Sequence, residues 1–241
     1  MLNSLYIGLS QQMALRNQMD GIANNVANMN TTGFKREEVL FREFLIPAED
    51  GTNYSYVMDF GISRDLADGE MTATGNSFDF AIKGEGFFAV ETINGNRYTR
   101  NGHFSLNDEG TLVTAAGDPL LDESGRQLTF MPEDGAITIA PDGRVSAEFS
   151  NLGALRLSLV TFDNLKALKK IGNGLYETAQ TPNDPEGSTI HQGMLENSNV
   201  RSVVEMTRMI EVSRKYELVQ RLIDAGYDLE RTAIQRLGQV Q

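Results

Sequence analysis

The residues that interrupt helices are confined to the middle of this chain. All six prolines lie between Pro47 and Pro185, and 18 of the 23 glycines lie between Gly51 and Gly193. Proline and glycine mark turns and are costly inside helices. A chain of 241 residues with this distribution is expected to have helical flanks and a central β-domain, which is an α+β fold.

The N-terminal flank has the apolar spacing of a packed helix. After Leu2, Leu5 and Leu9, apolar residues recur in alternating steps of four and three from Leu15 through Met19, Ile22 and Val26 to Met29. This period places the apolar side chains on one face of a helix. Gly33 and the polar residues before it are expected to end this helix.

The C-terminal flank has the strongest helical signal. Alternating steps of three and four connect Met209, Val212, Tyr216, Val219 and Ile223, and Leu222, Leu229 and Leu237 continue the stripe. Ser202 and Glu205 have the spacing of a capping box, and Asn199 is a candidate cap one turn earlier. About 40 residues at ~1.5 Å each give a helix of ~60 Å, which favours a coiled-coil-like pairing of the flanks. The alternative is two shorter helices that are separated near Gly226.

Short aromatic and β-branched runs fill the centre of the chain. FDFAIKG and GFFAVET are examples, and turn signals such as NDEG, DESG and PEDG separate such runs. We expect a β-domain over residues 71–195 and a discontinuous helical assembly domain over residues 1–31 and 196–241. Residues 32–70 have weak periodicity and are expected to form an extended, irregular connector.

The net charge of −12 is concentrated in the centre. Residues 38–194 contain 11 basic and 24 acidic residues, whereas the flanks are close to neutral. This composition argues against nucleic-acid binding, which requires a basic face. Neutral flanks can associate without a charge penalty. We see no apolar run of the ~18 residues that a membrane span needs, and no secretory signal at the start.

Residues that carry chemistry are sparse. The chain has no cysteine, which excludes disulfides and cysteine-based zinc sites. His103 and His191 match no catalytic motif and are expected in turns or at the surface. Gly84 and Gly86 match part of a phosphate loop, but a tight turn between strands is favoured because no helix is expected after them. We expect no enzymatic activity, and no catalytic, cofactor or metal site.

Four blocks of the sequence resemble the flagellar basal-body rod and hook proteins. IANNVANMNTTGFKRE is similar to the N-terminal signature of that family, GEMTATGNSFDFAIKGEGFFAV and YTRNGHFSLNDEGTLVTAAGDPLL to its β-domain motifs, and QGMLENSNVRSVVEMTRMIEVSRKYE to its closing helix. The blocks occur in the family's order along nearly the whole chain. The chain has room for one modest β-domain, which favours a rod protein over the larger hook protein. Its first and last segments are most similar to proximal-rod members, with distal-rod members as the alternative.

The resemblance implies a structural subunit of the bacterial flagellar rod, which self-assembles through its terminal helices and transmits torque across the periplasm. The implied partners are copies of the chain, other rod proteins and the flagellar type III export apparatus, which exports such subunits without a cleaved signal peptide. The resemblance implies neither binding of nucleic acid nor insertion into a membrane. A periplasmic enzyme and a non-flagellar coiled-coil adaptor are the alternatives, but neither explains the four blocks.

The predicted assembly interface combines the apolar stripes with the amides of the N-terminal signature. Its members are Leu2, Leu5, Leu9, Leu15, Met19, Ile22, Asn24, Asn25, Val26, Asn28, Gly33, Phe34, Asn199, Val203, Met206, Met209, Ile210, Val212, Tyr216, Val219, Leu222, Ile223, Leu229 and Leu237. We expect the helices to be loose in the monomer and to order on assembly, because each has little else to pack against.

The asparagines of the signature are expected to set the register of this packing. Buried amides that must find partners make incorrect registers costly. Asn24, Asn25 and Asn28 lie within about one helical turn and are the candidates. The alternative is that Asn24 and Asn25 face water and Asn28 ends the helix. On the first hypothesis, replacing Asn25 by leucine leaves folding intact and disturbs assembly.

Overall fold

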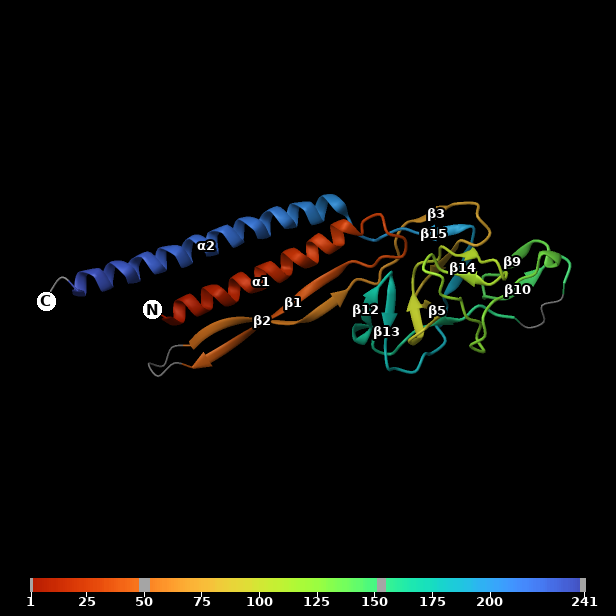
Figure 1. Cartoon of the computed structure of the whole chain (residues 1–241), viewed down its shortest axis with the longest axis horizontal. Coiled ribbons are helices and arrows are strands. Elements are labelled where there is room, and N and C mark those ends of the chain that lie inside the picture. The colour runs from red at the N-terminus through yellow and green to blue at the C-terminus, as the bar shows by residue number, and fades with distance from the viewer. Residues whose placement is uncertain (1, 48–52, 151–154, 239–241) are drawn as a thin grey trace. The chain divides into compact units, whose positions relative to one another are not determined.

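The computed structural model describes residues 2–47, 53–150 and 155–238, and it has the predicted α+β composition. The chain forms two compact units (Figure 1). The helical unit consists of Met1–Ala27, Glu37–Asp65 and Val200–Gln241, and the β unit of Asn28–Arg36 and Leu66–Asn199. Each unit is therefore built from segments that are distant in the sequence.

The helical unit contains two long helices and a hairpin. Its elements are α1 (Leu2–Ala27), β1 (Glu37–Pro47), β2 (Asn53–Arg64) and α2 (Ser202–Gly238). The two helices lie side by side and run in opposite directions, and the hairpin follows α1 (Figure 1). At ~1.5 Å per residue, the 37 residues of α2 span ~55 Å. This helix continues through Gly226 without a break, so the alternative of two shorter helices is wrong.

The hairpin corrects the expectation of an irregular connector over residues 32–70. Strands β1 and β2 pair in regular antiparallel register from Glu37 opposite Arg64 to Pro47 opposite Asn53. The register shifts between Leu40 and Phe41, which is the signature of a bulge. The extra residue, Phe60, belongs to β2, whose apolar residues alternate with a period of two in the sequence. Strand β1 lacks this alternation because its apolar residues fall in the runs VLF and FLI, which is why its strand pattern is weak.

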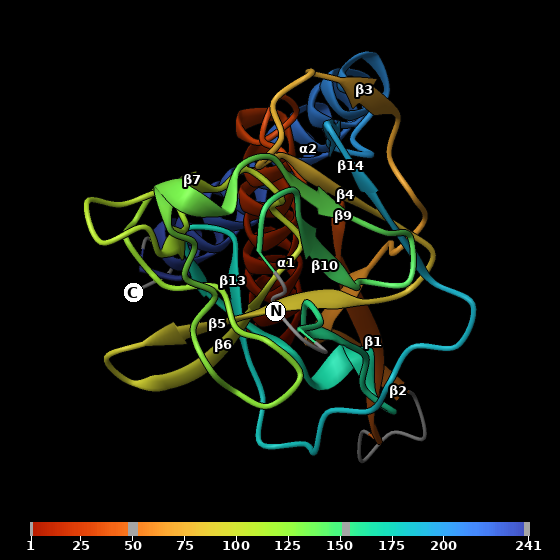
Figure 2. The same ribbon diagram turned by 90° about the vertical axis from the view of Figure 1, so that its right-hand side faces the viewer.

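The β unit is built from short strands. These are β3 (Met71–Ala73), β4 (Phe80–Lys83), β5 (Phe87–Thr92), β6 (Gly95–Thr99), β7 (Ser105–Leu106), β8 (Leu112–Val113), β9 (Ile137–Ile139), β10 (Val145–Ala147), β11 (Leu159–Val160), β12 (Lys169–Gly172), β13 (Leu175–Glu177), β14 (Thr189–Gln192) and β15 (Met194–Glu196), with the 3-10 helices η1 (Pro132–Asp134) and η2 (Leu165–Ala167). The largest sheet has the order β11-β5-β6-β13-β12, and the other strands of this unit form the pairs β4–β14, β3–β15, β9–β10 and β7–β8. Figure 2 shows β4 beside β14 and β9 beside β10.

Strand β5 supplies both faces of the core. Phe88 and Val90 point into one buried cluster, which also contains Phe104, and the rings of Phe88 and Phe104 lie edge to face at 5.5 Å. Phe87 and Ala89 point into a second cluster on the opposite face. Burial on both faces explains why this strand is a continuous apolar run in the sequence. The preceding Gly84 and Gly86 form the predicted turn between β4 and β5, and both have positive φ.

Candidate assembly surface

The seam between α1 and α2 uses nine of the predicted interface residues within one chain. Leu15, Ile22, Val212 and Val219 are buried there, each with at most 8% of its surface exposed. The partly buried members of the seam are Met19, Val26, Met209, Tyr216 and Ile223. The four buried side chains have little surface left for a neighbouring molecule, so their contribution is to hold the two helices together.

A second set of predicted residues remains at the surface of the helical unit. On α2 these residues are Val203, Met206, Ile210, Leu222 and Leu229, with exposed fractions between 48% and 75%. Leu9 on α1 is 49% exposed. Large apolar side chains at this density on one helix are the mark of an interaction surface. The side chains of Leu2, Leu5 and Leu237 lie outside the described residues.

Further apolar residues of this surface were not predicted. They are Tyr6 and Met13 on α1, Leu40, Phe44, Leu45, Ile46 and Ile62 on the hairpin, and Val204, Leu218 and Tyr227 on α2. The succession Phe44, Leu45, Ile46 in β1 was the available signal, because consecutive apolar residues in a two-stranded hairpin cannot all be covered. This run does not have the helical spacing from which the interface was predicted.

Asn25 joins three elements of the helical unit. Its side chain is 1% exposed, donates to the backbone oxygen of Glu37 at 2.7 Å and accepts from the Glu37 nitrogen at 3.0 Å. The same amide also donates to Oε2 of Glu205 at 3.3 Å. Asn25 in α1 is therefore bonded both to the start of β1 and to the first turn of α2. Glu205, which we expected in a capping box with Ser202, is 1% exposed and faces this amide and Arg208.

The other asparagines have different surroundings. Asn24 is exposed, as the alternative reading of this residue expected. Asn28 is half-buried, and its backbone oxygen accepts from the Thr31 nitrogen at 3.1 Å in the turn that follows α1. Asn199, which we considered as a helix cap, instead accepts from the Arg36 nitrogen at 2.7 Å. Of the amides named in the sequence, Asn25 has the contacts of a register determinant.

Gly33 and Phe34 belong to the core of the β unit. Gly33 has φ +68° and donates its N–H to the Glu196 oxygen at 2.8 Å. Phe34 is 5% exposed, and the ammonium of Lys170 lies 4.0 Å from its ring centroid. Within the chain, these residues therefore bind the segment after α1 to the β unit.

A buried ion network next to Gly33 was missed by the sequence analysis. Lys35 is 2% exposed and its ammonium lies 2.6 Å from Oε1 of Glu196, which is 1% exposed. Arg100 bonds to Oε2 of Glu196 at 2.8 Å and to Asp68 at 2.9 Å. Lys35 stands in the family signature, but nothing in the sequence indicated that its partner is 161 residues away. The two positive charges of this network, on Lys35 and Arg100, are matched by the two negative charges of Glu196 and Asp68.

The burial of Lys35 gives a prediction for the dependence of stability on pH. Burial lowers the pKa of Lys35 below its ordinary value of 10.5, and Arg100 lowers it further, although Glu196 and Asp68 oppose both effects. At pH values between the lowered pKa and 10.5, Lys35 is therefore protonated in the unfolded chain and deprotonated in the folded chain. Since the unfolded state binds more protons there, the contribution of Lys35 to the free energy of unfolding rises with pH.

Urea unfolding of the wild type and of Lys35→Met measures this contribution. The difference in the free energy of unfolding between wild type and variant is expected to increase from neutral pH toward 10.5. The variant serves as the control for every other group that titrates in this range. A difference that stays constant or decreases with pH would contradict the prediction.

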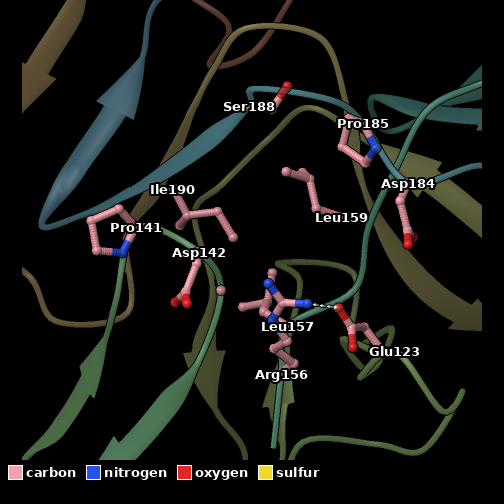
Figure 3. A pocket seen from close by; sticks show the side chains of 11 residues that line it. Glu123, Pro141, Asp142, Arg156, Leu157, Leu159, Asp184, Pro185, Ser188 and Ile190 are labelled. Atoms are coloured by element: carbon pink, nitrogen blue, oxygen red, sulfur yellow. Dashed lines mark hydrogen bonds and ion pairs between the residues drawn. The ribbon is translucent and has the colours of Figure 1, made fainter.

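A pocket of about 290 Å³ lies in the β unit (Figure 3). Leu157, Leu159 and Ile190 contribute apolar walls, and Arg156 bonds to Glu123 at 2.8 Å at its side. Its volume is at the lower limit of the roughly 300–1,000 Å³ that small-molecule sites occupy.

Of the histidines, His103 is exposed as expected, whereas His191 is half-buried in β14.

Among residues 2–47, 53–150 and 155–238, no three His, Cys, Asp or Glu side chains are grouped to hold a metal ion. In the same part of the chain, no helix has both the length and the apolar character that crossing a membrane requires. The exposed apolar side chains of the helical unit remain the candidate assembly site among the described residues.

Two long helices with exposed apolar faces, in a chain that also carries a β unit, are typical of a structural subunit of a larger assembly. Comparison with protein families agrees with this class. The family models described as "Flagella basal body rod protein", "Flagellar hook protein FlgE/F/G D1 domain" and "Flagellar basal body rod FlgEFG protein C-terminal" match residues 5–35, 81–147 and 191–236. The matches cover most of both long helices and, in the β unit, residues 28–35, 81–147 and 191–199.

Relatives that match over the full length identify the family. The chain is 46% identical to the flagellar basal-body rod protein FlgF of Caulobacter vibrioides and 36% identical to FlgF of Mesorhizobium japonicum, with 99% of each chain covered. It is 34% identical to FlgG of Bacillus subtilis, over 95% of this chain and 97% of that protein. The chain belongs to the flagellar basal-body rod protein family, whose members are structural subunits of the rod. FlgF is the proximal-rod member of the family and FlgG the distal-rod member, so the predicted greater similarity to proximal-rod members is confirmed.

Proposed function

We propose that this chain is a proximal-rod subunit, which assembles with its own copies and with other rod proteins through the exposed apolar faces of α1, α2 and the hairpin. The stripe of Val203, Met206 and Ile210 is the observation that carries the proposal, because its steps of three and four continue a helical face that the chain itself leaves exposed. Coiled-coil-like packing of this face on a neighbouring subunit buries it.

Burial of these side chains supplies the driving force for assembly. Each large apolar side chain contributes about 1.5–3 kcal/mol when it is removed from water, before the entropy costs of association. Many such contacts per subunit distribute torque over the interface. Contacts between different faces of successive copies do not close on themselves, so subunits add as an open helix.

The place of action and the route to it are part of the same proposal. The subunit acts in the periplasmic part of the basal body and reaches it through the flagellar type III export apparatus, without a cleaved signal peptide. The names of the full-length relatives support the location in the basal-body rod. The intact mass of the protein recovered from purified basal bodies tests the route, because a mass below that of the full sequence would reveal cleavage.

The state of the helices before assembly stays a prediction. We expect the helical unit to be folded but less stable than the β core in the isolated monomer, so that both helices are looser there than in the rod. The seam between them buries four apolar side chains, which is a small core for two helices of 26 and 37 residues. Hydrogen exchange over residues 2–27 and 202–238 measures this, and protection equal to that of the β core in the monomer would contradict it.

Replacing Ile210 by glutamate is expected to abolish rod assembly and leave the subunit folded. Ile210 is 54% exposed, so the change should alter the free energy of unfolding by less than about 0.5 kcal/mol. A charge at this position must be buried without a partner in the assembly, which costs several kcal/mol. Motility and the yield of basal bodies from cells that carry the variant are the measurements. Lys215→Glu, exposed on the same helix about 140° around its axis from Ile210, is the matched control. Normal rods with Ile210→Glu would contradict the proposal.

A further inference from the structure

Two distant segments of the chain close the β unit by bonding to each other. We call residues 33–36 together with residues 196–199 the clasp. Gly33 donates its N–H to the Glu196 oxygen at 2.8 Å, and the Asn199 nitrogen donates to the Phe34 oxygen at 3.4 Å. The Asn199 side chain accepts from the Arg36 nitrogen at 2.7 Å and donates to the Ala67 oxygen at 3.0 Å. The clasp thus joins the first and last residues of the β unit.

Glu196 is the centre of the clasp. Its carboxylate accepts from the Lys35 ammonium at 2.6 Å, from Nε of Arg100 at 2.8 Å and from the Gly69 nitrogen at 2.8 Å. Without Glu196, the ammonium keeps its bonds to the Leu66 and Ala67 oxygens, and the guanidinium keeps Asp68 and three backbone oxygens, but two buried cations then share one carboxylate. Burial of a charge that has lost its partner is costly. Docking of the Lys35 segment is therefore much less favourable until Glu196 is in place.

The strands that lead to Glu196 also complete the core. β14 pairs with β4, and Ile190 in β14 is 2% exposed within the main buried cluster. β15 pairs with β3 and ends at Glu196. The residues between 189 and 199 therefore supply hydrogen bonds, apolar contacts and the central carboxylate together.

We infer that the clasp controls the folding of the β unit: the segments before residue 189 do not reach their protected native state until Glu196 docks against Lys35 and Arg100. A chain that emerges with its N-terminus first then stays unfolded in this unit until residue 199 is available. This inference is independent of the proposed function. It is compatible with the proposed export route, because an unfolded β unit can be threaded.

Pulse-labelling hydrogen exchange during refolding of the wild-type chain tests the order of events. The amides of Gly33 and Gly69 report the clasp, since both donate to Glu196. The amides of Leu120 and Leu128 report the core, since they donate to Leu112 and Leu120 respectively. We expect the core amides to become protected no earlier than the clasp amides. Protection of the core amides first would overturn the inference.

Refolding and unfolding rates of Glu196→Gln provide a second test. If the clasp forms in the transition state, refolding slows about tenfold or more and unfolding changes less than about threefold. Glu177→Gln is the matched control, because Glu177 pairs with Arg97 at 3.5 Å with its side chain 45% exposed. An unchanged refolding rate with faster unfolding would mean that the clasp forms after the barrier, which contradicts the inference. If Glu196→Gln does not fold, the order in which the clasp and core amides of the wild type become protected still tests the inference.

Discussion

Replacing Gly33 by alanine is expected to lower the free energy of unfolding of the β unit by about 3 kcal/mol or more. Gly33 has φ +68°, a conformation that costs other residues roughly 1–2 kcal/mol. A Cβ at this position would lie 2.4 Å from the Arg100 oxygen and 2.5 Å from its carbonyl carbon. Because these are backbone atoms, relief requires a shift of the chain itself, which adds about 1–3 kcal/mol.

Gly75→Ala separates the two causes of this loss. Gly75 has φ +73°, and no atom lies within 4 Å of the position that its Cβ would occupy. This control therefore carries the conformational penalty without the collision, and we expect it to cost about 1 kcal/mol. Urea unfolding, with hydrogen exchange to assign the loss to the β unit, measures both variants. Equal losses in the two variants would show that the contact of Gly33 with Arg100 is unimportant.

Replacing Asn25 by leucine is expected to lower the free energy of unfolding of the helical unit by about 2–4 kcal/mol. The change removes the two bonds to the backbone of Glu37 and the bond to the buried Glu205 carboxylate. Each buried group that loses its partner costs about 1–3 kcal/mol, and the apolar side chain offsets part of this. From the sequence alone this variant was expected to fold normally; the bonds of Asn25 within its own chain lead us to expect a loss of stability instead.

Asn24→Leu is the matched control for Asn25, since the two residues are adjacent in α1 and Asn24 is exposed. We expect this control to change the free energy of unfolding by less than about 0.5 kcal/mol. Hydrogen exchange should show faster opening of the start of β1 and of the first turn of α2 in Asn25→Leu. If instead Asn25→Leu unfolds like the control, the amide does not hold these three elements together. A double-mutant cycle that combines Asn25→Leu with Glu205→Gln measures the coupling free energy between the two side chains.

The sequence alone was informative where a single element determines the pattern. The steps of three and four through Leu15 and Val212 predicted both helices and the face by which they pack, because a helix repeats every ~3.6 residues whatever surrounds it. The turn at Gly84 and Gly86 was predicted for the same reason, since backbone conformation there depends on a few adjacent residues. The hairpin was not predicted because β1 lacks a period of two: its apolar residues fall in the runs VLF and FLI.

The roles of individual polar residues were decided by the tertiary structure. Asn24 and Asn25 are chemically identical neighbours, yet one is exposed and the other is bonded to three groups, because successive residues of a helix differ by ~100° in direction. Lys35 and Glu196 are 161 residues apart, and lysine and glutamate are residue types that usually lie at the surface. Local periodicity therefore determined the helices and their packing face, whereas burial and long-range pairing, which depend on how the whole chain folds, determined which charges and amides hold each unit together.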